Sequence, residues 1–333
     1  MRRYSRTNFE KMSSNQECKK GLWDEICDWW RRQPDKLLFA CLLIPWILLF
    51  HFWGNITLGY VKTHSLFEWM HYVFSTSSDD EHGMLIPFVV LALFFWKREE
   101  LLASVRGIWW PALGIVILAV IIHLVGYRVQ QTRLSIVAFF TGIYGMLGLV
   151  WGAEFMRRSF FPMFLFAFCV PLGTEADRIT APLRVLASKI TSGIANGLFG
   201  IGVIRDGTRL FDPAGQYQYE VAAACSGIRS LTAVLAFSTI FGFVSFRKNW
   251  RRGLMILAAF PLAVASNVMR LLMIVLAAEL FGQEAGNYVH ESSWLSLLPY
   301  IPAMGGVVIL GYLLREPKPA ATPASQQREL QPV

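Results

Sequence analysis

Eight apolar stretches, separated by short polar segments, constrain the fold of this chain more than any other feature. A helix needs about 20 apolar residues to cross a bilayer, and most of the stretches reach or approach that length. They are residues 37–60, 82–96, 108–127, 135–151, 159–173, 221–246, 253–280 and 294–314, of which the second and fifth are short. We therefore predict an all-α integral membrane protein with about eight transmembrane helices.

Composition supports this class and excludes others. The chain is 54% hydrophobic and only 16% charged, whereas an ordinary soluble domain is roughly 25% charged. Its net charge of +8 comes from short basic runs between apolar segments, as in cytoplasmic loops, so nucleic acid is not an expected partner. The five cysteines form no CxxC pair, which indicates neither a zinc site nor a disulfide scaffold, and we predict no metal and no cofactor.

The distribution of Lys and Arg predicts the orientation in the membrane. The polar leader before Leu37 is basic, and so are alternate loops, including SFRKNWRRG. Among the opposite loops, FGQEAGNYVHESS carries Glu284 and Glu291 and no basic residue, whereas Arg128 and Arg133 go against the rule. With eight helices, both termini are then cytoplasmic.

Three regions follow along the chain. Residues 1–36 form a cytoplasmic leader, in which Trp23, Ile26, Cys27 and Trp30 have the spacing of an interfacial helix. Residues 37–314 form a polytopic membrane domain, and residues 315–333, rich in Pro, Ala and Gln, a disordered cytoplasmic tail. Between the fifth and sixth stretches lies an outer segment, residues 174–220. We expect an amphipathic helix in its first part and short strands around the DG and DPAG turn signals in its second.

The predicted topology brings three chemically distinctive side chains to one level near the outer surface. Cys225 lies about four residues into the sixth stretch, Arg270 about 15 Å inside the seventh, and His290 in the next outer loop. Each has a plainer explanation: packing among small residues for Cys225, snorkelling for Arg270 and an ordinary loop position for His290. A charge within a span is costly, however, and favours a functional or paired role for Arg270.

Cysteine chemistry needs a base and a group that stabilises an oxyanion. Cys225, His290 and Arg270 fit the roles of nucleophile, general acid/base and stabiliser in acyl transfer through a thioester, although His82 is a rival base by spacing alone. Three residues are predicted to support them. Arg229, four residues after Cys225, is expected to lower the thiol pKa, to contact substrate or to pair with Glu220. Asn267 is expected to hold Arg270 by hydrogen bonding.

These residues resemble a known family signature. EVAAACSGIRSL, then SNVMRLL, then a histidine in the next outer loop, is similar to the pattern of the exosortase/archaeosortase membrane transpeptidases, and the similarity extends over about residues 79–314. The resemblance matches Cys225, Arg270 and His290 to the family's cysteine, arginine and histidine. It implies an enzyme of the bacterial cytoplasmic (inner) membrane with its active site on the periplasmic side.

The resemblance also implies the substrate. Such enzymes recognise a C-terminal sorting signal of the PEP-CTERM type on membrane-anchored exported proteins, cleave it and pass the acyl group to a lipid or an envelope polymer. Residues alone do not separate hydrolysis from transpeptidation. The alternative function is a transporter or lipid-handling scaffold in which Arg270 binds an anionic group and Cys225 only packs, although the inverted repeats common in transporters are not seen.

Overall fold

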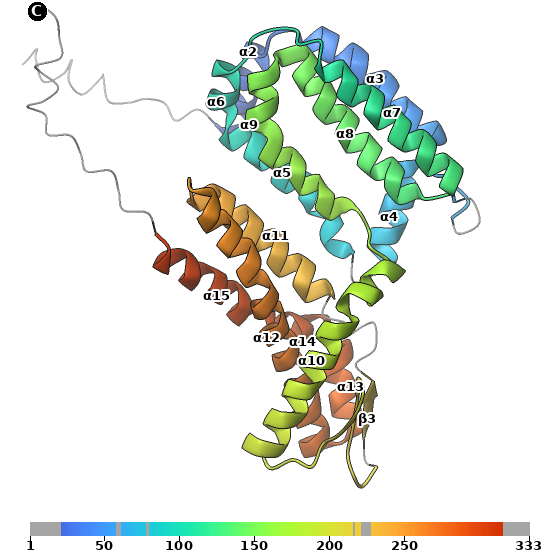
Figure 1. The fold of residues 1–333 in the computed structure, drawn as a ribbon, viewed down its shortest axis with the longest axis vertical. Helices are drawn as coiled ribbons and strands as arrows, with labels where there is room; N and C mark the ends of the chain where they lie inside the picture. The colour runs from blue at the N-terminus through green and yellow to red at the C-terminus, as the bar shows by residue number, and fades with distance from the viewer. Residues whose placement is uncertain (1–20, 58–60, 78–79, 216, 221–227, 316–333) are drawn as a thin grey trace, which may run out of the picture. The chain divides into compact units, whose positions relative to one another are not determined.

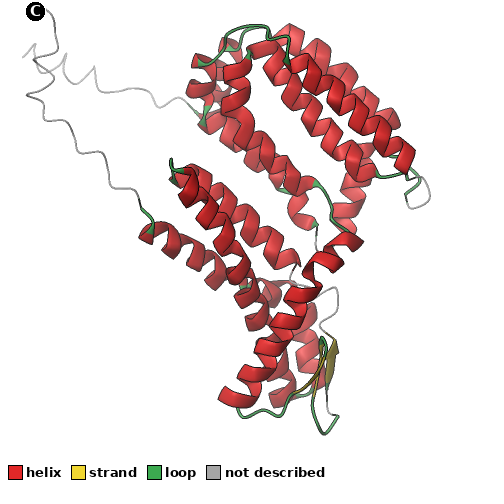
Figure 2. Cartoon of the chain, viewed as in Figure 1, coloured by secondary structure: helices red, strands yellow, loops and turns green. Residues whose placement is uncertain are grey.

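The computed structural model describes residues 21–57, 61–77, 80–215, 217–220 and 228–315. The described residues are 77% helical, and the described strands form one small sheet (Figure 2). The chain divides into two compact units, Met1–Tyr72 with Met84–Val170 and Val73–Gly83 with Pro171–Val333.

The first unit is a bundle of helices (Figure 1). In chain order its elements are α2 (Leu22–Arg32), α3 (Lys36–Trp53), α4 (Leu66–Thr76), which ends in the second unit, α5 (Ile86–Trp96), α6 (Arg98–Ala103), α7 (Ala112–Val129), α8 (Thr132–Trp151), α9 (Ala153–Phe164) and the 3₁₀ helix η2 (Leu165–Cys169). In an 18-residue window of each long helix, 61% of the residues are buried in α8, 22% in α7 and only 11% in α3. Helix α8 is therefore the core of this unit, and α3 and α7 present largely apolar outer surfaces suited to lipid.

Close packing of α3 on α8 depends on a glycine. The Trp46 indole Nε1 of α3 donates a hydrogen bond to the Phe139 carbonyl oxygen of α8 at 3.0 Å. A Cβ atom at Gly142 would overlap the same indole ring. Small residues allow membrane helices to approach closely, and Gly142 serves that purpose here.

The second unit carries the candidate site. Its elements are η1 (Glu81–Met84), α10 (Thr174–Leu198), β1 (Ile204–Asp206), β2 (Arg209–Phe211), β3 (Gln218–Glu220), α11 (Ile228–Ser245), α12 (Asn249–Phe281), α13 (Gln283–Glu291), α14 (Ser293–Leu297) and α15 (Tyr300–Leu313). Helices α11, α12 and α15 pack together around Val234, Met255 and Val307, which are fully buried. The half of α12 nearer Phe281 packs instead against α10 and the sheet, around Leu210, Tyr217 and Ile274.

The outer segment follows the prediction. Helix α10 covers the amphipathic part, and the two turn signals connect an antiparallel sheet of order β1-β2-β3. Gly207 in the DG turn and Gly215 in the DPAG turn have positive φ angles of 59° and 72°, which glycine adopts without steric cost. The helix and the sheet together form a cap over one half of α12, which we call the outer cap.

The predicted spans are confirmed in part. Four of them correspond to helices long and apolar enough to cross a membrane: α3, α7, α8 and α12. Three more correspond to shorter apolar helices, Glu81–Trp96, Leu231–Ser245 and Tyr300–Leu313. The fifth stretch, 159–173, is divided between α9, which contains Pro162, and η2. The chain is an all-α membrane protein apart from its small sheet, and the number eight stays a prediction.

The predicted leader helix exists as α2. The Arg98 Nη2 atom pairs with the Glu25 carboxylate of α2 at 2.9 Å, and the Trp29 ring contacts Phe95 edge-on at 6.5 Å between centroids. Trp23 and Trp30 point away from these contacts and are exposed. That arrangement is compatible with the predicted interfacial position, which stays a prediction. Of the predicted disordered tail, residues 316–333 lie outside the described residues.

Candidate active site

Helix α12 positions Arg270 well inside an apolar segment. The helix runs for 33 residues, and Arg270 lies 11 residues before its last residue, Phe281, which is about 16 Å along the axis. Asn267, one turn earlier, is buried with 5% of its surface exposed. Ser266 donates a hydrogen bond to the Pro299 carbonyl oxygen at 2.9 Å, which fixes this part of α12 beside the start of α15. The arginine is thus held on a rigid element.

A single glycine reverses the chain after α12. Gly282 has a φ angle of 88°, a conformation that glycine adopts readily, and its N–H donates to the Ala278 carbonyl oxygen at 2.8 Å. Helix α13 follows immediately and packs against α12 (Figure 1). As a result, the Arg270 Nη2 atom donates a hydrogen bond to the His290 carbonyl oxygen at 3.4 Å. The structure therefore brings Arg270 and His290 together.

Exposed aromatic side chains surround this end of α12. Phe281, Tyr288 and Trp294 are 78%, 70% and 83% exposed, and all belong to α12, α13 or α14. Tyr and Trp are enriched where membrane proteins meet the water interface. Such side chains are compatible with the level at which the sequence predicts the site, which stays a prediction.

The outer cap is tied directly to α13. The Gln218 N–H of β3 donates to the Gln283 Oε1 atom at 3.0 Å, and the Tyr219 hydroxyl donates to the Gln283 carbonyl oxygen at 3.0 Å. Gln283 is the first residue of α13. Strand β3 ends at Glu220, and α11, which packs on α12, begins at Ile228. Both ends of the intervening segment are therefore anchored on elements that contact the Arg270 and His290 helices.

The predicted nucleophile belongs to that segment. Cys225 lies outside the described residues, as do the side chains of Glu220 and Arg229, so their predicted roles stay predictions. The role of Asn267 also stays a prediction. His82, the rival base, lies in η1 of the same unit and is partly buried. Within the described residues, no group of His, Cys, Asp or Glu side chains could hold a metal ion.

The environment of His290 favours the neutral imidazole. Burial lowers the pKa of His290 below its ordinary value, the nearby Arg270 charge lowers it further, and the Glu291 carboxylate partly opposes them. An ordinary histidine titrates near pH 6.5, so His290 is mostly neutral at neutral pH. It is therefore in the form that a general base requires.

Replacing Glu291 with glutamine should shift the acid limb of activity to lower pH. The Glu291 carboxylate stabilises the imidazolium, so its removal lowers the pKa of His290. At a given acidic pH, a smaller fraction of His290 is then protonated and inactive as a base. The wild-type limb itself is expected below pH 6.5. The measurement is the pH profile of kcat/KM with a synthetic substrate. Glu284→Gln, an exposed change in the same helix, is the matched control, and a limb that moves upward in Glu291→Gln would contradict this role.

Replacing Gly286 with alanine should loosen α13. A Cβ atom at Gly286 would collide with the Tyr219 hydroxyl and lie 3.0 Å from the Ala278 Cβ atom. Overpacking of this kind costs about 1–3 kcal/mol, so both the unfolding temperature in detergent and the processing rate should fall. Gly305→Ala in α15, where a Cβ atom meets nothing within 4 Å, should change neither. Equal behaviour of the two variants would rule out close packing at Gly286.

Three positions were not found from the sequence: Gln283, Tyr219 and Gly286. Tyr219 looks like an ordinary strand residue, and Gln283 and Gly286 look like loop residues. Their importance comes from contacts between β3 and α13, about 65 residues apart. No local pattern signals such a contact.

Several apolar helices of membrane-spanning length, with an arginine inside one and a histidine folded back onto it, define a multi-pass membrane protein with a polar site near one end of its helices. The family model for transmembrane exosortases matches residues 69–298. The chain belongs to this family, which implies a membrane cysteine transpeptidase acting on proteins with sorting signals. No significant similarity to a curated protein or to a solved structure was found.

Proposed function

We propose that the chain is a membrane cysteine transpeptidase or protease that cleaves PEP-CTERM-like sorting signals of exported proteins at the outer face of the bacterial inner membrane. The contact between Arg270 and His290 is the observation that carries this proposal. It joins two of the three predicted catalytic residues across 20 positions of sequence, in a chain of the exosortase family. The anchoring of β3 and α11 places the ends of the Cys225 segment on the same helices.

The proposed reaction proceeds through a thioester. The Cys225 thiolate attacks the carbonyl carbon of the scissile peptide bond, and Arg270 stabilises the oxyanion of the tetrahedral intermediate. His290 takes the thiol proton and gives it to the leaving amine when the C–N bond breaks. Water or an acceptor nucleophile then attacks the thioester, its proton passes to His290, and the thiol is regenerated. A guanidinium carries a positive charge and five N–H donors, a combination that suits an oxyanion.

A membrane-anchored substrate suits this location. A sorting signal that precedes a transmembrane helix lies at the membrane boundary, and the exposed aromatic side chains of Phe281, Tyr288 and Trp294 support a site at that level. Confinement to the same bilayer raises the effective concentration of substrate at the site. The proposed orientation has both termini in the cytoplasm and Cys225 on the periplasmic side, with a lipid or envelope polymer as the acyl acceptor.

The test is the mass of the product. A tagged exported protein with a PEP-CTERM-like signal is co-expressed with the chain, and the new C-terminus is identified by mass spectrometry. We expect cleavage at the motif that depends on the chain. A product that ends in a free carboxylate indicates hydrolysis, and one with added mass indicates transpeptidation and identifies the acceptor. An intact signal in the presence of the folded chain would overturn the proposal.

A further inference from the structure

A groove on the surface of the first unit is not used by the proposed function. It runs along α8, α9 and η2 and consists of two neighbouring hollows of about 230 Å³ and 410 Å³. Tyr144 and Phe160 line both hollows, so the two adjoin. The larger hollow falls within the roughly 300–1,000 Å³ of small-molecule sites.

One end of the groove is apolar and its walls are fixed. The Phe140 ring of α8 stacks on Phe166 of η2 with 3.9 Å between centroids, and Phe160 stacks on Phe164 at 5.9 Å. The Tyr144 hydroxyl donates to the Met156 carbonyl oxygen at 3.1 Å. This contact satisfies the polar atom at the point where the two hollows meet. The groove is therefore preformed and suited to a hydrocarbon chain.

The other end is cationic and aromatic. Arg157, Met156 and Trp109 line the second hollow, and the neighbouring Trp110 is 70% exposed. Tryptophan is typical of the membrane–water interface. The apolar end of the groove thus extends away from Trp109 and Trp110, which suit the level of the lipid headgroups.

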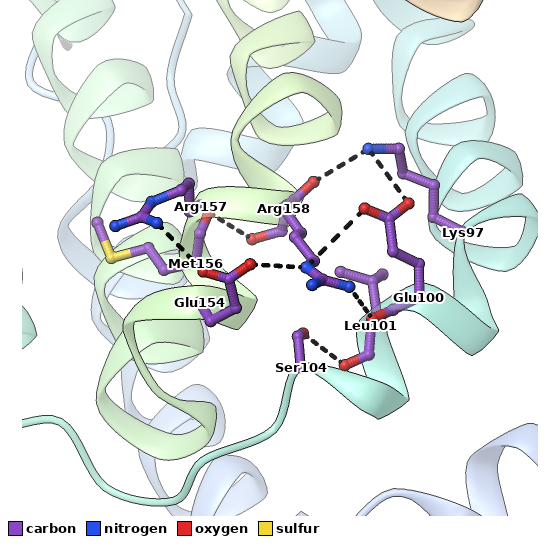
Figure 3. A network of polar contacts seen from close by, with 9 residues as sticks. Lys97, Glu100, Leu101, Ser104, Glu154, Met156, Arg157 and Arg158 are labelled. Atoms are coloured by element: carbon purple, nitrogen blue, oxygen red, sulfur yellow. Dashed lines mark hydrogen bonds and ion pairs between the residues drawn. The ribbon is translucent and has the colours of Figure 1, made fainter. Parts of the chain in front are cut away.

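The charge at this end is positive and lies at the groove. Figure 3 shows the network around Arg158, in which the cations are Lys97, Arg157 and Arg158 and the carboxylates are Glu100 and Glu154. Glu154 is shared, because it contacts Arg158 at 2.9 Å and Arg157 at 3.2 Å. Arg157 is 79% exposed, more than any other member of the network. The excess positive charge is therefore most accessible at Arg157.

We propose that this groove binds one phospholipid with an anionic headgroup, with the phosphate at Arg157 and an acyl chain between Phe140 and Phe164. Charge complementarity selects the headgroup, and the aromatic walls accept the chain. A transmembrane helix fits less well, because helices associate in membranes through small residues that allow close approach. Half of the residues that line the apolar hollow carry large aromatic rings. The site lies in the first unit and does not depend on the proposed cysteine chemistry.

The experiment is native mass spectrometry of the purified full-length chain in detergent with equal amounts of phosphatidylglycerol and phosphatidylcholine. The wild-type chain should retain phosphatidylglycerol preferentially. Arg157→Gln should lower that preference about fivefold, the factor expected for one basic residue at an anionic headgroup. Arg128→Gln, which changes an exposed arginine in the last turn of α7, is the matched control and should leave it unchanged.

A second variant tests the apolar end. Ala167 is exposed in η2 and lines the groove, so Ala167→Trp should fill it and reduce retention of both lipids. Equal retention of the two lipids by the wild-type chain would overturn the proposal, and so would an equal loss in Arg157→Gln and Arg128→Gln. Unchanged phosphatidylglycerol binding in Ala167→Trp would also overturn it. Arg157 contributes only a surface ion pair to the fold, and elution profiles like that of the wild type verify that each variant is folded.

Discussion

Replacing Cys225 with alanine should abolish processing of a sorting signal, with a fall in rate of at least about a thousandfold. Without the thiol, no thioester forms, and the arginine and histidine have no nucleophile to assist. The measurement is the time course of cleavage of a tagged substrate expressed with each variant. Cys41→Ala, which changes an exposed cysteine in α3, is the control and should process at the wild-type rate.

Unchanged processing by Cys225→Ala would remove the nucleophile assignment. The alternative function, transport or lipid handling with Arg270 binding an anionic group, predicts no difference in processing between Cys225→Ala and the wild type. It also predicts uptake or lipid movement in reconstituted vesicles that is insensitive to the same substitution. Both measurements use the full-length chain, so one set of purified variants separates the two functions.

Replacing Arg270 with glutamine should lower kcat by about 10²–10³-fold with little change in KM. This is the effect of removing one donor to a developing oxyanion, because such an interaction is made mainly in the transition state. Arg270→Lys keeps the charge and loses the planar fork that reaches the His290 carbonyl oxygen at 3.4 Å. We expect the lysine variant to recover only a small part of the rate.

The control for Arg270 is another arginine that bonds a carbonyl oxygen. Arg205 in β1 is exposed and donates from Nη1 to the Gly207 carbonyl oxygen at 2.8 Å, and Arg205→Gln should retain full activity. Full activity in Arg270→Lys would show that charge alone suffices. Full activity in Arg270→Gln would contradict a role in the reaction. A raised KM with an unchanged kcat would indicate that Arg270 binds substrate and does not stabilise the transition state.

The outer cap shows how far local sequence signals reach. The DG and DPAG turns require positive φ angles that glycine provides, so they predict the three short strands correctly. The apolar spacing likewise predicts α10. The division of 159–173 between α9 and η2 was not predicted, because the start of α9 is polar and Pro162 lies within it. A hydropathy window averages over such local interruptions.

The proximity of Arg270 and His290 was predicted from topology, but the contact between them was not. Alternation of helices across a membrane places Arg270 and His290 at one depth, and the structure brings them into contact. That the contact uses a backbone carbonyl, and that Gln283 ties β3 to α13, depends on the fold-back at Gly282 and on pairing between distant segments. Neither is encoded in a local pattern.

Arg270 bonds the backbone of residue 290 and not its imidazole ring. The oxygen belongs to the main chain, so every side chain at this position preserves the link between α12 and α13. A substitution at residue 290 can therefore remove proton transfer and keep the link between α12 and α13. A variant with a small side chain at position 290 keeps its scaffold and leaves a vacancy the size of an imidazole ring, into which free imidazole from solution can enter as a substitute base.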